Sequence, residues 1–173
     1  MLVTVLGFYG GYPYKGIGTS GYLLRNGDKS YLIDCGSGVL NSLASYMKPT
    51  DLDGVILSHY HHDHTADVGV LQYEWLAAKK ENLLPIYGHT QDFVNFAQLS
   101  VDNATKGIAY NDYEPTQIDD LKFEFMRTVH PVPAYAMRIT DKNGKVIVYT
   151  ADTTYFDGLV DFAKDADLLI ADT

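Results

Sequence analysis

Hydrophobic and polar residues along the chain follow two periods, and these predict strands that alternate with helices. Short apolar runs at 31–33 and 55–57 are typical of buried strands. Apolar residues three to four positions apart over 65–80 predict a helix that turns Leu71 and Trp75 inward. In this first part the predicted strands are 2–8, 20–25, 29–34, 53–58 and 84–87, and the predicted helices are 38–47, 65–80 and 91–99.

The second part of the chain resumes as strands. Residues 121–125 alternate with period two, and Asn143-Gly144 is a turn signal between the next two strands. The predicted strands are 121–127, 134–140, 145–150 and a buried strand at 168–170, and the predicted helix is 155–164. No repeat, low-complexity tract or linker interrupts the 173 residues. We therefore predict a single α/β domain over 1–173, with sheets covered by helices.

Composition and charge narrow the possible partners. The 22 acidic residues outnumber the 13 basic ones, so the net charge is −9, which disfavours RNA as a partner. No apolar run reaches the roughly 20 residues that a membrane helix needs, and the start lacks the basic flank of a signal peptide. We expect a cytoplasmic protein with no membrane partner. The single Cys35, interpreted as a small buried hydrophobe, excludes an internal disulfide and a multi-cysteine zinc cluster.

The most informative segment lies between a buried strand and a helix that begins near His64. Four of the six histidines fall within six consecutive positions. In an extended stretch His59 and His61 point the same way and can hold one divalent ion, while Asp63 and His64 can face a second. His62 is expected to point away, because one ion rarely takes more than four protein ligands. A solvated histidine-rich loop is the alternative.

Two distant residues complete this pattern. His130 follows the strand 121–127, and Asp152 follows the strand 145–150. Both are ligand types at strand ends, where α/β folds place their sites. Taken alone, His130 would be a loop histidine and Asp152 an N-cap of the helix 155–164. Beside the histidine cluster, a carboxylate that bridges two dications is the stronger interpretation of Asp152.

Together these residues resemble the metallo-β-lactamase superfamily. The motif is His59-x-His61-x-Asp63-His64, followed by His130 and Asp152, and the Asp-Cys-Gly-Ser-Gly segment at 34–38 also matches. The Leu-Ser-His segment at 57–59 and the Tyr-Thr-Ala-Asp-Thr run at 149–153 place the resemblance nearest the ribonuclease Z-like branch. The resemblance covers essentially the whole chain, which looks like a small bacterial metal-dependent hydrolase.

This resemblance implies an αββα sandwich with the site at one edge. It implies a first metal bound by His59, His61 and His130, a second bound by Asp63 and His64, and Asp152 as the bridge between them. The usual metal of the family is zinc, with manganese or iron in some branches. A water held between two divalent ions would become the nucleophile, and Asp63 would move a proton to or from the reacting group.

Two departures from the family pattern are visible. The family continues past a strand such as 168–170 to a further histidine of the second metal site, whereas this chain ends at Thr173. We therefore expect either a C-terminally incomplete fragment or a second metal held only by its three named side chains and solvent, and so a weaker second site. Asp67 stands where ribonuclease Z usually has glycine. It is either an acid of the first helical turn or a partner of a ligand histidine.

Other polar candidates carry weaker signals. His89 is expected to be structural or to lie at the rim of the site, and Asp34 to fix a loop as a hydrogen-bond acceptor. Asp172 could be an acid that contacts a ligand residue and not the metal itself. The glycine-rich loop 10–16 does not match a phosphate-binding loop, but its aromatic residues and Lys15 are expected to line the mouth of the cleft.

The first functional hypothesis is a hydrolase with two divalent metal ions, and most specifically a phosphodiesterase for a small phosphodiester or ester. The acidic balance and the lack of a long basic insertion speak against a transfer-RNA substrate. The alternatives are a thioester or lactone hydrolase of the same superfamily and a metal-binding protein without turnover. The metals cannot identify the bond cleaved, because they stabilise phosphorane-like and tetrahedral oxyanions alike. The sequence does not fix the oligomeric state, and a homodimer is one of the states it allows.

Overall fold

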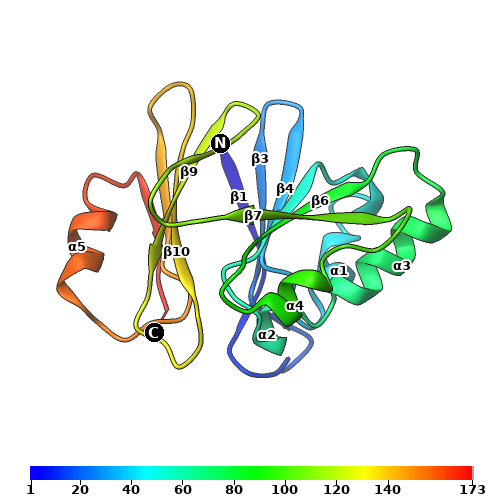
Figure 1. Ribbon diagram of the computed structural model, residues 1–173, viewed down its shortest axis with the longest axis horizontal. Coiled ribbons are helices and arrows are strands. Elements are labelled where there is room, and N and C mark those ends of the chain that lie inside the picture. Colours follow the sequence, from blue (N-terminus) through cyan, green and yellow to red (C-terminus); the bar gives the residue numbers. More distant parts are fainter. Residues whose placement is uncertain (173) are drawn as a thin grey trace. The chain divides into compact units, whose positions relative to one another are not determined.

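The computed structural model describes residues 1–172 and divides into two compact units, Met1–Ala109 and Tyr110–Thr173. Each unit contains a β-sheet and helical structure (Figure 1), so the predicted α/β class is confirmed in both. The prediction of a single domain over 1–173 stays a prediction.

The first unit is built on a sheet that has seven strands among the described residues, in the order β2-β1-β3-β4-β5-β6-β7. The strands are β1 (Leu2–Tyr9), β2 (Gly18–Thr19), β3 (Gly21–Asn26), β4 (Lys29–Ile33), β5 (Gly54–Ile56), β6 (Leu84–His89) and β7 (Thr105–Tyr110). β4 and β5 are parallel, with Ile33 opposite Ile56. Because parallel strands end at the same edge of a sheet, the loops after β4 and β5 begin side by side.

Helices pack on this sheet around one apolar core. They are α1 (Val39–Leu43), the short 3-10 helix η1 (Pro49–Asp51), α2 (His62–Thr65), α3 (Val68–Ala78) and α4 (Phe93–Ala97). Leu71 and Trp75 of α3 are buried in the same cluster as Leu43 of α1 and Leu32 of β4. This core anchors α1 and α3, and with them the loops that precede both helices.

The helix predicted over 65–80 forms as α3 over Val68–Ala78, whereas the helix start expected near His64 is the separate short helix α2. The chain turns at Asp67, whose N–H donates to the Cys35 carbonyl oxygen at 3.0 Å. The Asp67 carboxylate accepts a hydrogen bond from the Leu40 N–H at the start of α1, also at 3.0 Å. Asp67 therefore stabilises α1, and neither of the two roles inferred for it from the sequence describes this contact.

The second unit contains a sheet that has five strands among the described residues, in the order β12-β11-β10-β9-β8. Its elements are β8 (Thr116–Ile118), β9 (Leu121–Arg127), β10 (Tyr135–Thr140), β11 (Val146–Tyr149), α5 (Asp157–Ala163) and β12 (Leu168–Ile170). Alternate residues of β9 are buried, as the period of two predicts. Arg138 of β10 donates to the carbonyl oxygens of Phe162 and Lys164, which holds the end of α5 against β10.

Two features of the sheets differ from the expectation. β12 forms where a buried strand was predicted, but Leu168 and Leu169 are 42% and 50% exposed, so the predicted burial is wrong. Among the described residues β12 pairs with β11 alone and is an edge strand. The hydrophobic pattern also fails to predict β2, β7 and β8, which lack a continuous apolar run.

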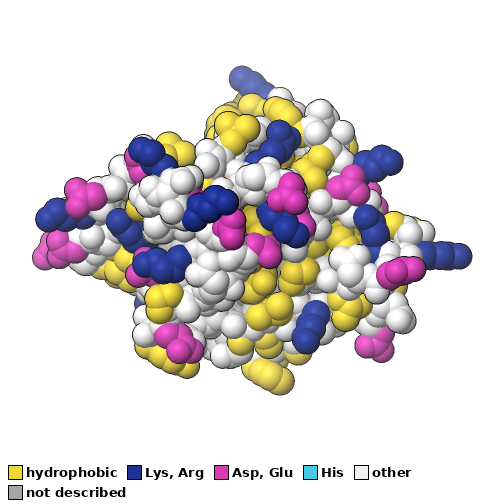
Figure 2. Space-filling model, turned by 90° about the horizontal axis from the view of Figure 1, so that it is seen from above, with side chains coloured by type: hydrophobic (Ala, Val, Ile, Leu, Met, Phe, Trp, Pro, Cys, Tyr) yellow, Lys and Arg dark blue, Asp and Glu magenta, His cyan; other side chains and the backbone are white. Residues whose placement is uncertain are grey.

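Charged side chains of both signs lie interspersed on the face drawn in Figure 2. Lys and Arg side chains there stand close to Asp and Glu side chains, and the net charge of the chain is −9. Within residues 1–172 no helix is both long and apolar enough to cross a membrane.

Candidate metal centre

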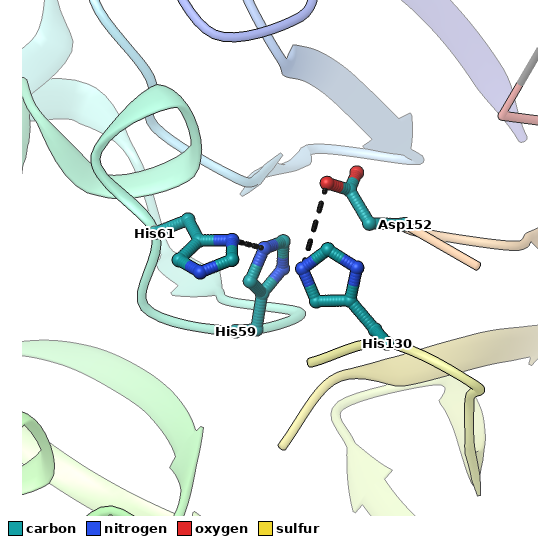
Figure 3. Close-up of side chains that lie close together, drawn as sticks. All are labelled: His59, His61, His130 and Asp152. Atoms are coloured by element: carbon teal, nitrogen blue, oxygen red, sulfur yellow. Dashed lines mark hydrogen bonds and ion pairs between the residues drawn. The ribbon is translucent and has the colours of Figure 1, made fainter. Parts of the chain in front are cut away.

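The loop from β5 to α2 holds two imidazole rings edge to face, with 76° between the ring planes. His59 is fully buried and His61 is half-buried. The Nε2 atom of His59 lies 3.1 Å from the Nδ1 atom of His61 (Figure 3). His62, the next residue, is exposed and belongs to neither group of candidate ligands.

Asp34, directly after β4, organises this loop. Its Oδ1 accepts a hydrogen bond from the Ser58 N–H at 2.7 Å. Its Oδ2 accepts from the Ser58 hydroxyl at 2.8 Å and from Nδ1 of His64 at 2.7 Å. Asp34 is fully buried and has a φ of +54°, a conformation rare for a residue other than glycine. The predicted role of Asp34 as a loop-fixing acceptor is confirmed.

These hydrogen bonds determine which ring nitrogens can bind a metal. A neutral His64 that donates from Nδ1 to Asp34 carries its lone pair on Nε2. The single hydroxyl proton of Ser58 is used on Asp34, so its oxygen accepts from Nδ1 of His59 at 3.0 Å. His59 therefore also carries its lone pair on Nε2, the atom that faces His61.

A divalent ion fits this pair of rings. Two ligand nitrogens of a tetrahedral zinc ion, each at about 2.0–2.1 Å from the metal, lie about 3.3 Å apart. The 3.1 Å between His59 and His61 is close to that separation. Imidazole nitrogens together with carboxylate oxygens are ligands that zinc, manganese and iron accept.

Asp63 and His64 form a second pair in the same unit. Oδ2 of Asp63 lies 3.7 Å from Nε2 of His64, which is too long for a hydrogen bond but within reach of two ligands on one ion. The same oxygen accepts a hydrogen bond from the Gly11 N–H at 2.8 Å. Gly36 packs directly against the backbone carbonyl of Asp63, where any side chain would overlap it. The loop 10–16 therefore contacts a candidate site residue.

The second unit carries His130 and Asp152 on two loops that are tied together. Nε2 of His130 and Oδ2 of Asp152 lie 3.8 Å apart (Figure 3). The Thr128 hydroxyl donates to the Asp152 carbonyl oxygen at 2.8 Å, and the Thr154 N–H donates to the Val129 carbonyl oxygen at 3.1 Å. These bonds place the loops after β9 and β11 next to one another, as their strand-end positions predict.

Asp172 forms hydrogen bonds with the loop that carries Asp152. Its carboxylate accepts a hydrogen bond from the Thr153 N–H at 3.2 Å, and its own N–H donates to the Thr150 hydroxyl at 2.9 Å. Ala151, between these residues, has a φ of +51°. The left-handed conformation costs such a residue about 1–2 kcal/mol, so the surrounding hydrogen bonds hold a strained loop in place.

Cys35 and His89 are structural in the fold. Burial raises the pKa of the Cys35 thiol, and the Asp67 and Asp34 carboxylates raise it further, so the thiol stays protonated and is a small buried hydrophobe as predicted. His89 is buried, with its ring centroid 4.5 Å from that of Tyr60. The Tyr60 hydroxyl donates to the His89 carbonyl oxygen at 2.7 Å.

The predicted ligands thus fall into two sets, one in each unit. The first unit holds His59, His61, Asp63 and His64, and the second holds His130 and Asp152. Their role as metal ligands stays a prediction. Sequence reasoning missed Ser58, Gly11 and Thr128, which hold these side chains or their loops. Only Ser58 gave a signal, as a polar residue between a buried strand and the first histidine.

Asp34→Ala is expected to lower the free energy of unfolding by about 3 kcal/mol or more, because it removes the acceptor of three buried hydrogen bonds. Urea unfolding in the presence of a chelator measures this without a contribution from bound metal. Asp53→Ala is the matched control: Asp53 accepts from the Ser30 N–H and from Lys29, but its side chain is 26% exposed. Its loss should be about 1 kcal/mol. Equal losses would contradict the central role of Asp34.

Comparison with known proteins identifies the family. Residues 14–171 match the family model described as the metallo-beta-lactamase superfamily. The chain is 49% identical over 176 residues to the probable metallo-hydrolase YhfI of Bacillus subtilis, covering 99% of this chain and 72% of YhfI. The crystal structure of YhfI matches with a TM-score of 0.93 at 48% identity, over 96% of this chain and 68% of that chain.

Two further proteins are more distant. Ribonuclease Z of Mycolicibacterium gilvum is 28% identical over 178 residues, covering 86% of this chain and 60% of that protein. The crystal structure of the short form of human tRNase Z matches with a TM-score of 0.74 at 22% identity, over 96% of this chain and 75% of that chain. These matches confirm the predicted metallo-β-lactamase type of fold. The chain therefore belongs to the metallo-β-lactamase superfamily, among its metallo-hydrolases.

Proposed function

We propose that this chain is the hydrolytic part of a phosphodiesterase with two divalent metal ions, most specifically zinc. His59, His61, His130 and Asp152 hold the first ion, and Asp63, His64 and the bridging Asp152 hold the second. The observation that carries this proposal is the paired arrangement of His59 and His61, whose facing nitrogens have the separation of two zinc ligands. With three protein ligands, the second site is the weaker one.

Such ions, when bound, lower the pKa of water to near neutrality and neutralise the charge that develops on a reacting phosphoryl group. The protein's own residues then hold the groups in place and move protons. Asp63, held by the Gly11 N–H, accepts a proton from the attacking water or returns one to the leaving oxygen. Ser58 and Asp34 keep the rings of His59 and His64 in one tautomer and one orientation.

The choice of a small phosphodiester rests on two observations. The relative named ribonuclease Z acts on phosphodiester bonds by its name, and it aligns with 86% of this chain. The net charge of −9 and the mixed charges in Figure 2 disfavour a long nucleic acid. A thioester or lactone hydrolase is the second candidate, and a metal-binding protein without turnover is the third. We also propose a cytoplasmic location without a membrane partner, and leave a homodimer as the assembly to test.

Hydrolysis of bis(p-nitrophenyl) phosphate by zinc-loaded protein tests this function. We expect turnover of this phosphodiester to exceed that of a thioester and of a panel of lactones, and to vanish after chelation and return with added zinc. Protein that is loaded with metal and folded, yet cleaves only the thioester or a lactone, would contradict the phosphodiesterase assignment. Absence of turnover on every substrate would favour a binding protein.

A further inference from the structure

The loop between β1 and β2 is a formed hairpin. The backbones of Tyr14 and Ile17 exchange two hydrogen bonds, each 3.0 Å long. The two residues between them, Lys15 and Gly16, have φ angles of +49° and +79°. Positive φ at both central residues is the mark of the type I′ turn, which closes two-residue β-hairpins. Residues 14–17 therefore form a tight turn at the end of this loop, and residues 9–17 are termed the finger below.

A hydrogen bond joins the backbone of the finger to Asp63, the proposed proton carrier. The Gly11 N–H donates to Oδ2 of Asp63 at 2.8 Å, and Gly11 itself has a φ of +73°, which suits glycine. The backbone of the finger thus contacts the proposed proton carrier directly, one residue before Tyr12.

The finger displays aromatic rings and one cation. Tyr12 is 71% exposed and Tyr14 is 47% exposed. Nζ of Lys15 lies 5.2 Å from the centroid of the Tyr14 ring, and the rings of Tyr9 and Tyr14 pack edge to face with their centroids 5.6 Å apart. Within residues 1–172, Lys15 forms no ion pair. A cation and exposed aromatic rings therefore stand together on the finger, whose Gly11 N–H contacts Asp63.

We infer that the finger selects phosphodiesters whose uncleaved ester group is aromatic. Tyr12 stacks on the ring of that group, because aromatic side chains bind planar rings through their faces. Lys15, held by the Tyr14 ring, attracts the phosphate charge in a chain whose net charge is −9. This inference rests on the proposed function and names the substrate class of the same site.

A pair of substrates with one leaving group tests Tyr12. Bis(p-nitrophenyl) phosphate and methyl p-nitrophenyl phosphate both release p-nitrophenolate, but their uncleaved groups are aromatic and methyl. We expect Tyr12→Ala to lower kcat/KM about tenfold for the first and by less than about twofold for the second. Tyr73→Ala is the matched control, because Tyr73 is 78% exposed on α3, away from the finger. It should change neither value.

Lys15→Met tests the cation. It should raise KM several-fold for both diesters at low salt, with a smaller rise at high salt, because an exposed charge is screened. Lys106→Met is the control: Lys106 is exposed on β7, at the opposite edge of the sheet from β2. A Tyr12→Ala variant that loses the same factor on both diesters would overturn the inferred selectivity.

Binding separates this inference from the proposed function. Phenylphosphonate and methylphosphonate carry the same contrast of ring and methyl group, and calorimetric titration of metal-loaded protein measures their affinities without turnover. If no diester is cleaved but Tyr12→Ala weakens phenylphosphonate alone, the phosphodiesterase proposal fails and the finger stands as an aromatic-anion site. If both phosphonates respond equally to Tyr12→Ala, the inference about the finger fails, whatever the turnover.

Discussion

His61→Ala and His130→Ala are each expected to remove the first metal ion and to lower kcat by more than about 10³-fold. The reason is that the proposed first site has four protein ligands, and the loss of either imidazole leaves three, the number that makes the proposed second site the weaker one. Without the ion, the pKa of the water is no longer lowered, and the water is a poor nucleophile at neutral pH. Elemental analysis after dialysis measures the metal, and initial rates on a phosphodiester measure the chemistry.

The matched control lies in the same loop. His62 is exposed and belongs to neither candidate ligand group, so His62→Ala should keep both the metal content and the rate of the unchanged protein. The decisive variant is His130→Ala, because His130 lies far along the chain from the histidine cluster. Full metal content in that folded variant would show that His130 is not a ligand of the first ion.

Asp63→Asn is expected to lower kcat by about 10²–10⁴-fold, the range of a lost general acid or base, while the first ion is retained. The amide has nearly the shape of the carboxylate, and its oxygen can still accept the hydrogen bond from Gly11. It cannot accept and return a proton. Steady-state kinetics together with metal analysis of the same sample separate the two effects.

One control variant and two possible outcomes decide what the Asp63→Asn experiment shows. Asp67→Asn, four positions further on, serves as the control, because Asp67 supports α1 through the Leu40 N–H and should not affect turnover. Loss of both metals with unfolding of the Asp63 variant would show that this residue is chiefly structural. Activity equal to that of the unchanged protein would remove Asp63 from the mechanism.

The parts of the molecule that could be predicted from the sequence are those with dense local signals. Four histidines in six positions after an apolar run indicate a metal loop at a strand end, and β4, β5 and β9 follow from their apolar patterns. The family was also visible in that motif and is confirmed by the match over residues 14–171. The assignment of each ligand to a metal stays a prediction.

The remaining features depend on contacts between residues far apart in the chain. Asp34 and His64 are 30 positions apart, and Gly11 and Asp63 are 52 apart, so no local pattern links them. The break between α2 and α3 has a similar origin, because Asp67 bonds to Cys35. The burial predicted for β12 was wrong because an apolar run indicates a strand without telling whether another layer covers it.

The hydrogen bonds of Asp34 bear on the choice of metal. Since Asp34 orients Ser58 and His64 in the protein itself, the ligand atoms are set in one arrangement before an ion arrives and do not rearrange to suit each ion. For nitrogen and oxygen donors, intrinsic affinity rises from manganese through iron to copper, with zinc below copper. Because affinity alone would favour copper, a fixed arrangement lets geometry oppose that order, and we expect correct metallation to depend on this geometry together with the ions that the cell makes available.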